Sequence, residues 1–322
     1  MKAKKQFLLV KNLAAAPVLV AFAQGCSQPK TSENTTTQPS TAAAQAVLKT
    51  QTGPFVLAEK AEVKSEYIAQ TELTVPPDLA PQNKWVMFEG PTLENELIAY
   101  RFYLDSRHRS DIFGKKTNAL VMDTVGWEYH DIMDWGSDIL KVGESLGIGS
   151  PAIWYRDSLL TLSDCAEKTV EVVEGKGQAV SVRFTFRDLK IGSETRTIVQ
   201  LWSLSAGRPH SKVELSVAEG KLPEGAVFAT GIVKHLPEAE SGTENGKFYL
   251  FSWGAQSFHH QNLGMGIVAD MEYLPVVREN PLSHLAVFEN SAAGVTYEFA
   301  AAWEADVMGL KSAADFRAAL LK

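Results

Sequence analysis

The feature that most constrains the fold is an alternation of apolar and polar residues with a period of two, which dominates from about residue 63 onward. In residues 179–187 (AVSVRFTFR), valines and phenylalanines occupy one set of alternating positions, and the two arginines belong to the other. Because successive side chains of a β-strand point to opposite faces of a sheet, this pattern predicts a strand with one buried face.

Residues 96–105 (ELIAYRFYLD) show the same alternation. One predicted face carries Ile98, Tyr100, Phe102 and Leu104, and the other carries Ala99, Arg101, Tyr103 and Asp105. This arrangement would place Arg101 and Tyr103 side by side on one face of the strand.

Many further segments of this kind are separated by glycine and polar turn residues. Strands are expected at residues 66–75, 84–89, 169–174, 194–204, 210–218, 227–235, 247–253, 265–273, 284–290 and 294–303. A helix is expected only at the end, where Ser312 can cap residues 313–321, and a short helical turn near residues 137–142 is an alternative to loop. The sequence therefore predicts an all-β fold, a large sandwich with a short C-terminal helix.

The N-terminal residues resemble an export signal. In residues 1–25, lysines are followed by a short apolar stretch and then by small residues, as in a signal peptide. Cleavage before Cys26 would resemble bacterial lipoprotein processing, with the lipid carried by Cys26. We expect residues 26–62 to form a lipidated flexible tether and residues 63–322 to form a single β-sandwich domain. The protein would be exported, either periplasmic or anchored to the outer membrane, and would touch the membrane only through its lipid.

The net charge limits the possible partners, and the cysteine content limits the possible disulfides. The net charge of −7 argues against nucleic acid as a partner, whereas a local basic pocket would still accept an anionic small ligand. With Cys26 lipidated, Cys165 is the only other cysteine, so no internal disulfide is expected. The fold must then be stabilised by its apolar core.

The densest mixture of aromatic, acidic, basic and glycine residues lies in residues 126–154 (GWEYHDIMDWGSDILKVGESLGIGSPAIW). Such a segment is typical of a long loop on a rigid scaffold, and loops of this kind often carry function. His130 follows Tyr129 and lies near Trp127 and Trp135, a setting that can tune the pKa of a general acid or base. A loop pinned to the surface by its tryptophans is the alternative.

Other standard catalytic patterns are absent. The sequence lacks Gly-x-Ser-x-Gly, His-Glu-x-x-His, Walker and Cys-x-x-Cys motifs, and no cofactor is expected. Carboxylates cluster around Gly90 and within residues 131–138, most simply as solvated acids, with bound calcium as an open alternative. His235 ends the predicted strand at residues 227–235, and side chains at strand ends commonly enter a cleft.

Several short segments, in their order along the sequence, resemble the bacterial family named domain of unknown function 4861. They are WVMFEGP (85–91), ENELIAYRFYLD (94–105), DIFGK (111–115), YH (129–130), DWGSDILKVG (134–143), TGIVKH (230–235) and WGAQS (253–257). The resemblance implies a β-sandwich of the galactose-mutarotase type. It also implies association with the degradation of uronic-acid polysaccharides, such as ulvan and pectin-like glycans. The activity implied is an oligosaccharide dehydratase that converts a uronic acid at the non-reducing end into an unsaturated one.

Such an elimination requires a cation on the substrate carboxylate, a base for the C5 proton and an acid for the departing 4-hydroxyl. Arg101 is the predicted carboxylate partner, with a strand-face salt bridge to an acid such as Asp105 as the alternative. His130 and His235 are the predicted base and acid, with Tyr129 in reserve for either role. Predicted substrate contacts are Tyr103, Arg107, Trp127, Trp135 and Lys141, the tryptophans as stacking platforms.

Other function classes use the same residue types. A mutarotase, an epimerase or a polysaccharide lyase could act on the same kind of fold. A carbohydrate-binding lipoprotein without catalytic activity would need Arg101 and the aromatic residues but not the histidines. In each case, the expected partner is a carbohydrate, and for the dehydratase it is an anionic oligosaccharide.

Overall fold

The alternating segments form antiparallel strands, which the computed structural model describes over residues 43–57 and 60–322. These residues lie in one unit of the chain, Thr41–Lys322. The described strands form sheets of nine, six, five and two strands, and every strand pair is antiparallel. The predicted all-β class is therefore confirmed.

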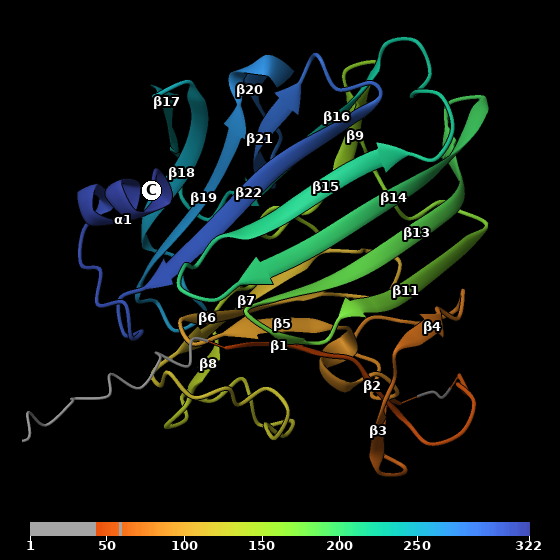
Figure 1. Cartoon of the computed structure of the whole chain (residues 1–322), viewed down its shortest axis with the longest axis vertical. Helices are drawn as coiled ribbons and strands as arrows, with labels where there is room; N and C mark the ends of the chain where they lie inside the picture. The colour runs from red at the N-terminus through yellow and green to blue at the C-terminus, as the bar shows by residue number, and fades with distance from the viewer. Residues whose placement is uncertain (1–42, 58–59) are drawn as a thin grey trace, which may run out of the picture. The chain divides into compact units, whose positions relative to one another are not determined.

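The nine-stranded sheet is the largest layer, and its long central strands lie side by side in Figure 1. Its strands, in spatial order, are β17 (Glu240–Glu244), β18 (Lys247–Ala255), β19 (Asn262–Asp270), β22 (Gly294–Trp303), β15 (Ser211–Val217), β14 (Glu194–Ser205), β13 (Ala179–Ile191), β11 (Glu167–Glu174) and β4 (Glu72–Thr74). The predicted alternation of residues 179–187 is confirmed in β13, where Val180, Val182, Phe184 and Phe186 are all buried.

Two further sheets contribute to the core, and a small sheet lies beside them. The six-stranded sheet runs β12 (Lys176–Gly177), β1 (Ala44–Val47), β5 (Thr92–Asn95), β6 (Ile98–Phe102), β7 (Ser110–Lys115) and β8 (Gly136–Asp138). The five-stranded sheet runs β10 (Ser158–Thr161), β9 (Ala152–Tyr155), β16 (Ala226–Val233), β21 (Ser283–Phe288) and β20 (Pro275–Glu279). The two-stranded sheet pairs β2 (Lys49–Gln51) with β3 (Tyr67–Ala69).

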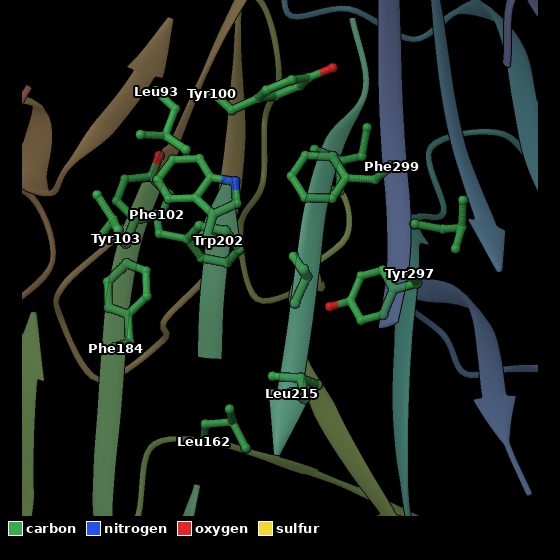
Figure 2. Packing of buried hydrophobic residues seen from close by; sticks show 14 of the residues in the cluster. Leu93, Tyr100, Phe102, Tyr103, Leu162, Phe184, Trp202, Leu215, Tyr297 and Phe299 are labelled. Atoms are coloured by element: carbon green, nitrogen blue, oxygen red, sulfur yellow. The ribbon is translucent and has the colours of Figure 1, made fainter. Parts of the chain in front are cut away.

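Ring contacts show how the sheets stack. Phe102 of β6 lies 4.8 Å from Trp202 of β14, and Tyr100 of β6 lies 5.0 Å from Phe299 of β22, measured between ring centroids. Tyr297, two residues before Phe299 and therefore on the same face, stacks on a phenylalanine of β21 at 5.7 Å. Figure 2 shows the rings of Tyr100, Phe102, Trp202, Tyr297 and Phe299 in the core. The six- and five-stranded sheets therefore pack against one face of the nine-stranded sheet, as in a sandwich.

The outer face of the six-stranded sheet carries a second apolar cluster and, beside it, the candidate site. Ala99 and Phe113 of β6 and β7 pack there against Phe88, Met122 and Tyr129, which come from the segments that cover this face. The predicted two-faced character of residues 96–105 is thus confirmed: one face of β6 enters the sandwich core, and the other lies under these covering segments.

Two predicted strands differ from the structure. Residues 66–75 form two short strands in different sheets, β3 and β4, instead of one. Residues 84–89 are not a strand: Asn83 Oδ1 accepts a hydrogen bond from the backbone N–H of Val86 (3.0 Å), and Met87–Glu89 form the short 3₁₀ helix η1. The helical turn considered near residues 137–142 is not formed: residues 137–138 end the edge strand β8, and residues 139–142 are loop.

The folded domain begins earlier than residue 63. Strand β1, within the segment expected as a tether, pairs with both β5 and β12, and Gln45 donates a hydrogen bond from Nε2 to the buried Glu94 (2.6 Å). Short, small side chains made this segment look like linker, but Ala44 and Val47 are buried. The expected signal segment (1–25) and Cys26 lie outside the described residues.

The C-terminal helix is confirmed. Helix α1 spans Ala313–Leu320 and begins after Ser312, whose hydroxyl accepts a hydrogen bond from the backbone N–H of Asp315 (3.1 Å). A Cβ added at Gly264 of β19 would come within 2.6 Å of the ring of Phe316, so glycine allows the helix to pack closely on this strand. A second short 3₁₀ helix, η2, spans Met271–Tyr273. Among the described residues, none of the helices has the length and apolar character needed to cross a bilayer.

Candidate active site

A buried group of charged and phenolic side chains lies on the outer face of β6 and β7. Arg101 Nη2 is 2.6 Å from Asp111 Oδ2 and 2.8 Å from Asp138 Oδ2, and it donates a hydrogen bond to the Tyr103 hydroxyl. Arg101 Nη1 donates to the Tyr129 hydroxyl (3.2 Å). Burial and the Asp111 carboxylate raise the pKa of Asp138, while Arg101 opposes this shift. We call these five residues the Arg101 cluster.

The predicted role of Arg101 as partner of a substrate carboxylate does not fit this geometry. Its side chain is only 1% exposed, and two internal carboxylates already engage its guanidinium. The expected proximity of Arg101 and Tyr103 is confirmed, with the guanidinium carbon 4.4 Å from the ring centroid. The alternative, a salt bridge from Arg101 to a nearby acid, is what the structure shows, with Asp111 of the neighbouring strand as the partner in place of Asp105. Asp105 pairs with Arg107 (2.6 Å), so Arg107 is engaged in an ion pair as well. Breaking such buried pairs is costly, so this group supports the site without binding substrate directly.

A cleft of about 800 Å³ lies next to the Arg101 cluster. It is lined by Gln51, Thr52, Gly53, Pro54, Phe55, Val56, Leu57, Lys60, Ala61, Glu62, Lys64, Ala80, Pro81, Gln82, Asn83, Lys84, Trp85, Glu89, Tyr129 and His130. Cavities of this size hold one or a few sugar-sized groups. Of the residues predicted from sequence to act in the site, Tyr129 and His130 line the cleft.

His130 connects the cleft to the Arg101 cluster. Its Nδ1 lies 3.4 Å from Asp138 Oδ2, and its ring lies 4.4 Å from the ring of Tyr129. The side chain is 57% exposed, so its other edge can meet a ligand. Burial and the positive charge of Arg101 lower the pKa of His130 below its ordinary value, against the opposing effect of Asp111. The imidazole is therefore neutral near pH 7 and competent to accept a proton.

Tyr129 is held more tightly than His130. Its hydroxyl accepts the hydrogen bond from Arg101, and burial raises its pKa to about 12 even though Arg101 acts in the opposite direction. The phenol therefore keeps its proton at neutral pH. Buried Ser137 also donates a hydrogen bond from its hydroxyl to the carbonyl of Tyr129 (3.2 Å), which fixes the backbone just before His130.

Glu89 is a functional candidate that the strand prediction for residues 84–89 concealed. Its φ of 63° and that of Phe88 (58°) lie in the left-handed region, which non-glycine residues rarely adopt. The Glu89 side chain is buried, and Oε2 accepts a hydrogen bond from the backbone N–H of Gln82 (2.6 Å). Burial raises the pKa of Glu89, although Arg101 lowers it. Glu89 Oε2 also lies 3.7 Å from Arg107 Nη2. Because burial raises the pKa of this carboxyl group, Glu89 is a candidate proton donor in the cleft.

Lys84 is the cation best placed to meet an anion in the cleft. It is half-buried, and Nζ lies 3.5 Å from the ring centroid of Trp127. Burial lowers its pKa, and the charge of Glu89 counteracts this. Within residues 43–57 and 60–322, no ion pair engages Lys84, in contrast to Arg101. Lys60 and Lys64 line the same cleft from its exposed side.

The remaining predicted residues lie elsewhere or are covered. His235 Nε2 contacts the carbonyl oxygen of Lys141 (2.8 Å), so these two candidates lie side by side, but neither lines the cleft. One face of Trp127 is occupied by Lys84, and Trp135 packs on Phe113 at 6.3 Å. Neither tryptophan lines the cleft. The described residues contain no group of three or more His, Cys, Asp or Glu side chains arranged to hold a metal ion, and Cys165 is free.

The fold and the cleft define an all-β sandwich protein with a histidine-containing site at the outer face of one sheet. The chain belongs to the family described as Domain of unknown function (DUF4861), whose profile matches residues 22–322. No curated protein matches the chain in sequence.

Solved structures with low similarity to parts of this chain include the following two. A putative aldose 1-epimerase from Klebsiella pneumoniae subsp. pneumoniae is 8% identical, with a TM-score of 0.35, over 74% of this chain and 83% of that chain. The alpha-N-acetylgalactosaminidase NagBb from Bifidobacterium bifidum, in complex with GalNAc, is 11% identical, with a TM-score of 0.27, over 68% of this chain. The match spans only 34% of the length of that enzyme.

Proposed function

We propose that the protein is a carbohydrate-active enzyme that eliminates water from a uronic acid at the non-reducing end of an oligosaccharide. The observation that carries the proposal is the composition of the cleft. One cavity of about 800 Å³ is lined by a histidine with a lowered pKa, a buried carboxyl group with a raised pKa, and a lysine that no described residue engages in an ion pair. These are the base, the acid and the cation that such an elimination requires.

The cation makes the C5 proton removable. In a uronate, C5 carries the carboxylate, and its proton is poorly acidic while that carboxylate keeps its full negative charge. Lys84 can pair with the carboxylate and stabilise the negative charge that builds up as the proton leaves. Because Lys84 is partly desolvated, this interaction is stronger than it would be in bulk water.

His130 and Glu89 can then complete the reaction. His130 takes the C5 proton, the electron pair of the C5–H bond forms the C4=C5 double bond, and the C4–O bond breaks. Glu89 donates a proton to the departing hydroxyl group, which leaves as water. Asp138, 3.4 Å from His130 Nδ1, stabilises the imidazolium formed in the first step. Tyr129 remains the reserve acid in this scheme, because its phenol also lines the cleft.

An epimerase or mutarotase is the second candidate. The presence of a histidine and a glutamate in one cleft supports it. In a mutarotase, a base takes the proton of the C1 hydroxyl and an acid protonates the ring oxygen as the C1–O5 bond breaks; in an epimerase, the two groups remove and return a proton at one carbon. The lysines favour elimination, because an epimerase acting on a neutral sugar has no carboxylate to neutralise.

The test is the mass of the product. Purified protein would be incubated with saturated oligosaccharides ending in glucuronate, iduronate or galacturonate. Loss of one water, with the ultraviolet absorbance of a double bond conjugated to a carboxylate, supports the proposal. A product of unchanged mass and altered stereochemistry supports the epimerase, and chain cleavage with the same absorbance indicates a polysaccharide lyase. Binding without any reaction would leave a carbohydrate-binding protein and overturn both enzyme proposals.

A further inference from the structure

One aromatic side chain of the described residues is turned toward solvent. Phe258 is 48% exposed, whereas every other Phe, Tyr or Trp of residues 43–57 and 60–322 is buried or half-buried. Leaving a ring in water is unfavourable, so an exposed ring beside a candidate active site often marks a binding surface.

The loop that carries Phe258 is held firmly in place. It connects β18 to β19, and the backbone N–H of Phe258 donates to the carbonyl of Ile139 (2.7 Å), just after β8. Within the loop, the backbone N–H of Gln261 donates to the hydroxyl of Ser257 (2.9 Å). The neighbouring His259 contacts the hydroxyl of Ser137 through Nε2 (2.9 Å). A ring fixed in this way is pre-organised, so a ligand that stacks on it need not order the loop.

Phe258 lies beside His130 but is not one of the residues that line the cleft. The two ring centroids are 6.1 Å apart, at an interplanar angle of 39°. Ser137 hydrogen-bonds to both His259 and the carbonyl of His130, so one buried hydroxyl links the loop to the candidate base. Two more exposed apolar residues, Ile132 and Met133, follow His130 in the chain.

We propose that Phe258 forms a second sugar subsite, which binds the residue glycosidically linked to the reacting uronate. The proposal rests on the proposed function, because the reacting sugar is placed in the cleft against His130. The next sugar would then extend past His130 and present the C–H face of its pyranose ring to Phe258. The subsite takes an apolar sugar face, while the charged sugar is recognised in the cleft. An oligosaccharide should therefore bind more tightly than a glycoside with no second sugar.

The test compares two substrates and three variants. The substrates are the methyl glycoside of glucuronate, which has no second sugar, and a saturated tetrasaccharide that ends in glucuronate. Phe258→Ala should raise KM for the tetrasaccharide about tenfold, the size of one aromatic stacking contact, with kcat unchanged. KM for the methyl glycoside should not change. Phe258→Trp should restore tetrasaccharide binding, and Leu274→Ala, which removes another exposed apolar side chain, should have no effect.

Other results would overturn the subsite or test it independently of the proposed function. An unchanged KM for the tetrasaccharide, or the same change for both substrates, would overturn the subsite. If wild-type protein eliminates no water, the proposed function fails. The subsite is then tested on its own, by measuring tetrasaccharide binding to each variant by calorimetry. A weaker affinity in Phe258→Ala alone would support stacking, whereas equal affinity in all variants, or no binding to wild-type protein, would exclude it.

Discussion

Arg101 and Lys84 are both cations near the cleft, but their surroundings give them different tasks. Arg101 is buried between Asp111 and Asp138, whereas Lys84 is half-buried and forms no ion pair within the described residues. A buried arginine that already satisfies two carboxylates cannot turn to a substrate without leaving both unpaired. Arg101 therefore stabilises the fold and fixes Asp138 beside His130, and Lys84 remains available for an anion.

Replacing each cation should separate these tasks. Arg101→Met should lower the free energy of unfolding by about 3–5 kcal/mol, because two buried carboxylates lose their partner. Lys84→Met should change stability by less than about 0.5 kcal/mol, as expected for a partly exposed side chain without an ion pair, while raising KM for a uronate substrate. Urea unfolding and steady-state kinetics measure both effects. An Arg101→Met variant that is fully stable but fails to bind substrate would contradict the assignment of Arg101 to stability and Lys84 to substrate binding.

The pH dependence of the reaction should report His130. Its pKa is lowered in the folded protein, so the neutral form that accepts a proton persists below the ordinary histidine value of about 6.5. Activity should therefore be lost only as the pH falls below about 6.5 and the imidazole takes up a proton. A pH profile of kcat/KM measures this. An acidic limb centred above pH 6.5 would show that His130 is not the base or that its pKa is raised.

At the scale of strands and loops, regular alternation could be read from the sequence, whereas local hydrogen bonding could not. Residues 179–187 alternate without interruption and form part of β13 as predicted. Residues 84–89 also contain strand-forming residues, but Asn83 and the left-handed Phe88 and Glu89 turn the chain there. That turn brings Glu89 into the cleft. Because residues 84–89 were predicted as a strand, Glu89 was not recognised as a candidate site residue.

A truncation tests the revised start of the domain. A chain that begins at Thr41 should unfold cooperatively, because it keeps β1 between β12 and β5. A chain that begins at Val63 lacks β1 and β2 and exposes an edge of the six-stranded sheet, so it should lose cooperative unfolding or aggregate. Circular dichroism during heating would distinguish the two. Equal melting temperatures would mean that residues 44–51 add nothing to the folded domain.

At the scale of the whole molecule, the site combines segments that are distant in sequence. Tyr129 and His130 were predicted from a dense local mixture of residue types, and both line the cleft. Lys84 and Phe258 have no such local signal, since only the packing of the sheets and loops brings them near His130. His235, predicted from its position at a strand end, follows β16 and contacts the carbonyl oxygen of Lys141, outside the cleft lining.

The net charge of the chain allows a test of where substrate charge is recognised. The protein carries −7 overall, so long-range forces repel an anionic oligosaccharide, whereas the lysines of the cleft attract it at short range. Added salt screens both effects over roughly 10 Å at 0.1 M. If the cleft lysines dominate, KM should rise with salt, and Lys84→Met should weaken this dependence. A KM that falls with salt would show that overall repulsion dominates and that the lysines do not bind the substrate.

The central claim is that His130 removes the C5 proton of a uronate while the 4-hydroxyl leaves. The most direct measurement follows a glucuronate-terminated oligosaccharide labelled with deuterium at C5, using wild-type protein and His130→Gln. Wild-type protein should release the label together with one water, and His130→Gln should bind the oligosaccharide but slow the reaction by at least about a hundredfold. A product that keeps the label at C5, or a His130→Gln variant that reacts at the wild-type rate, would contradict the account.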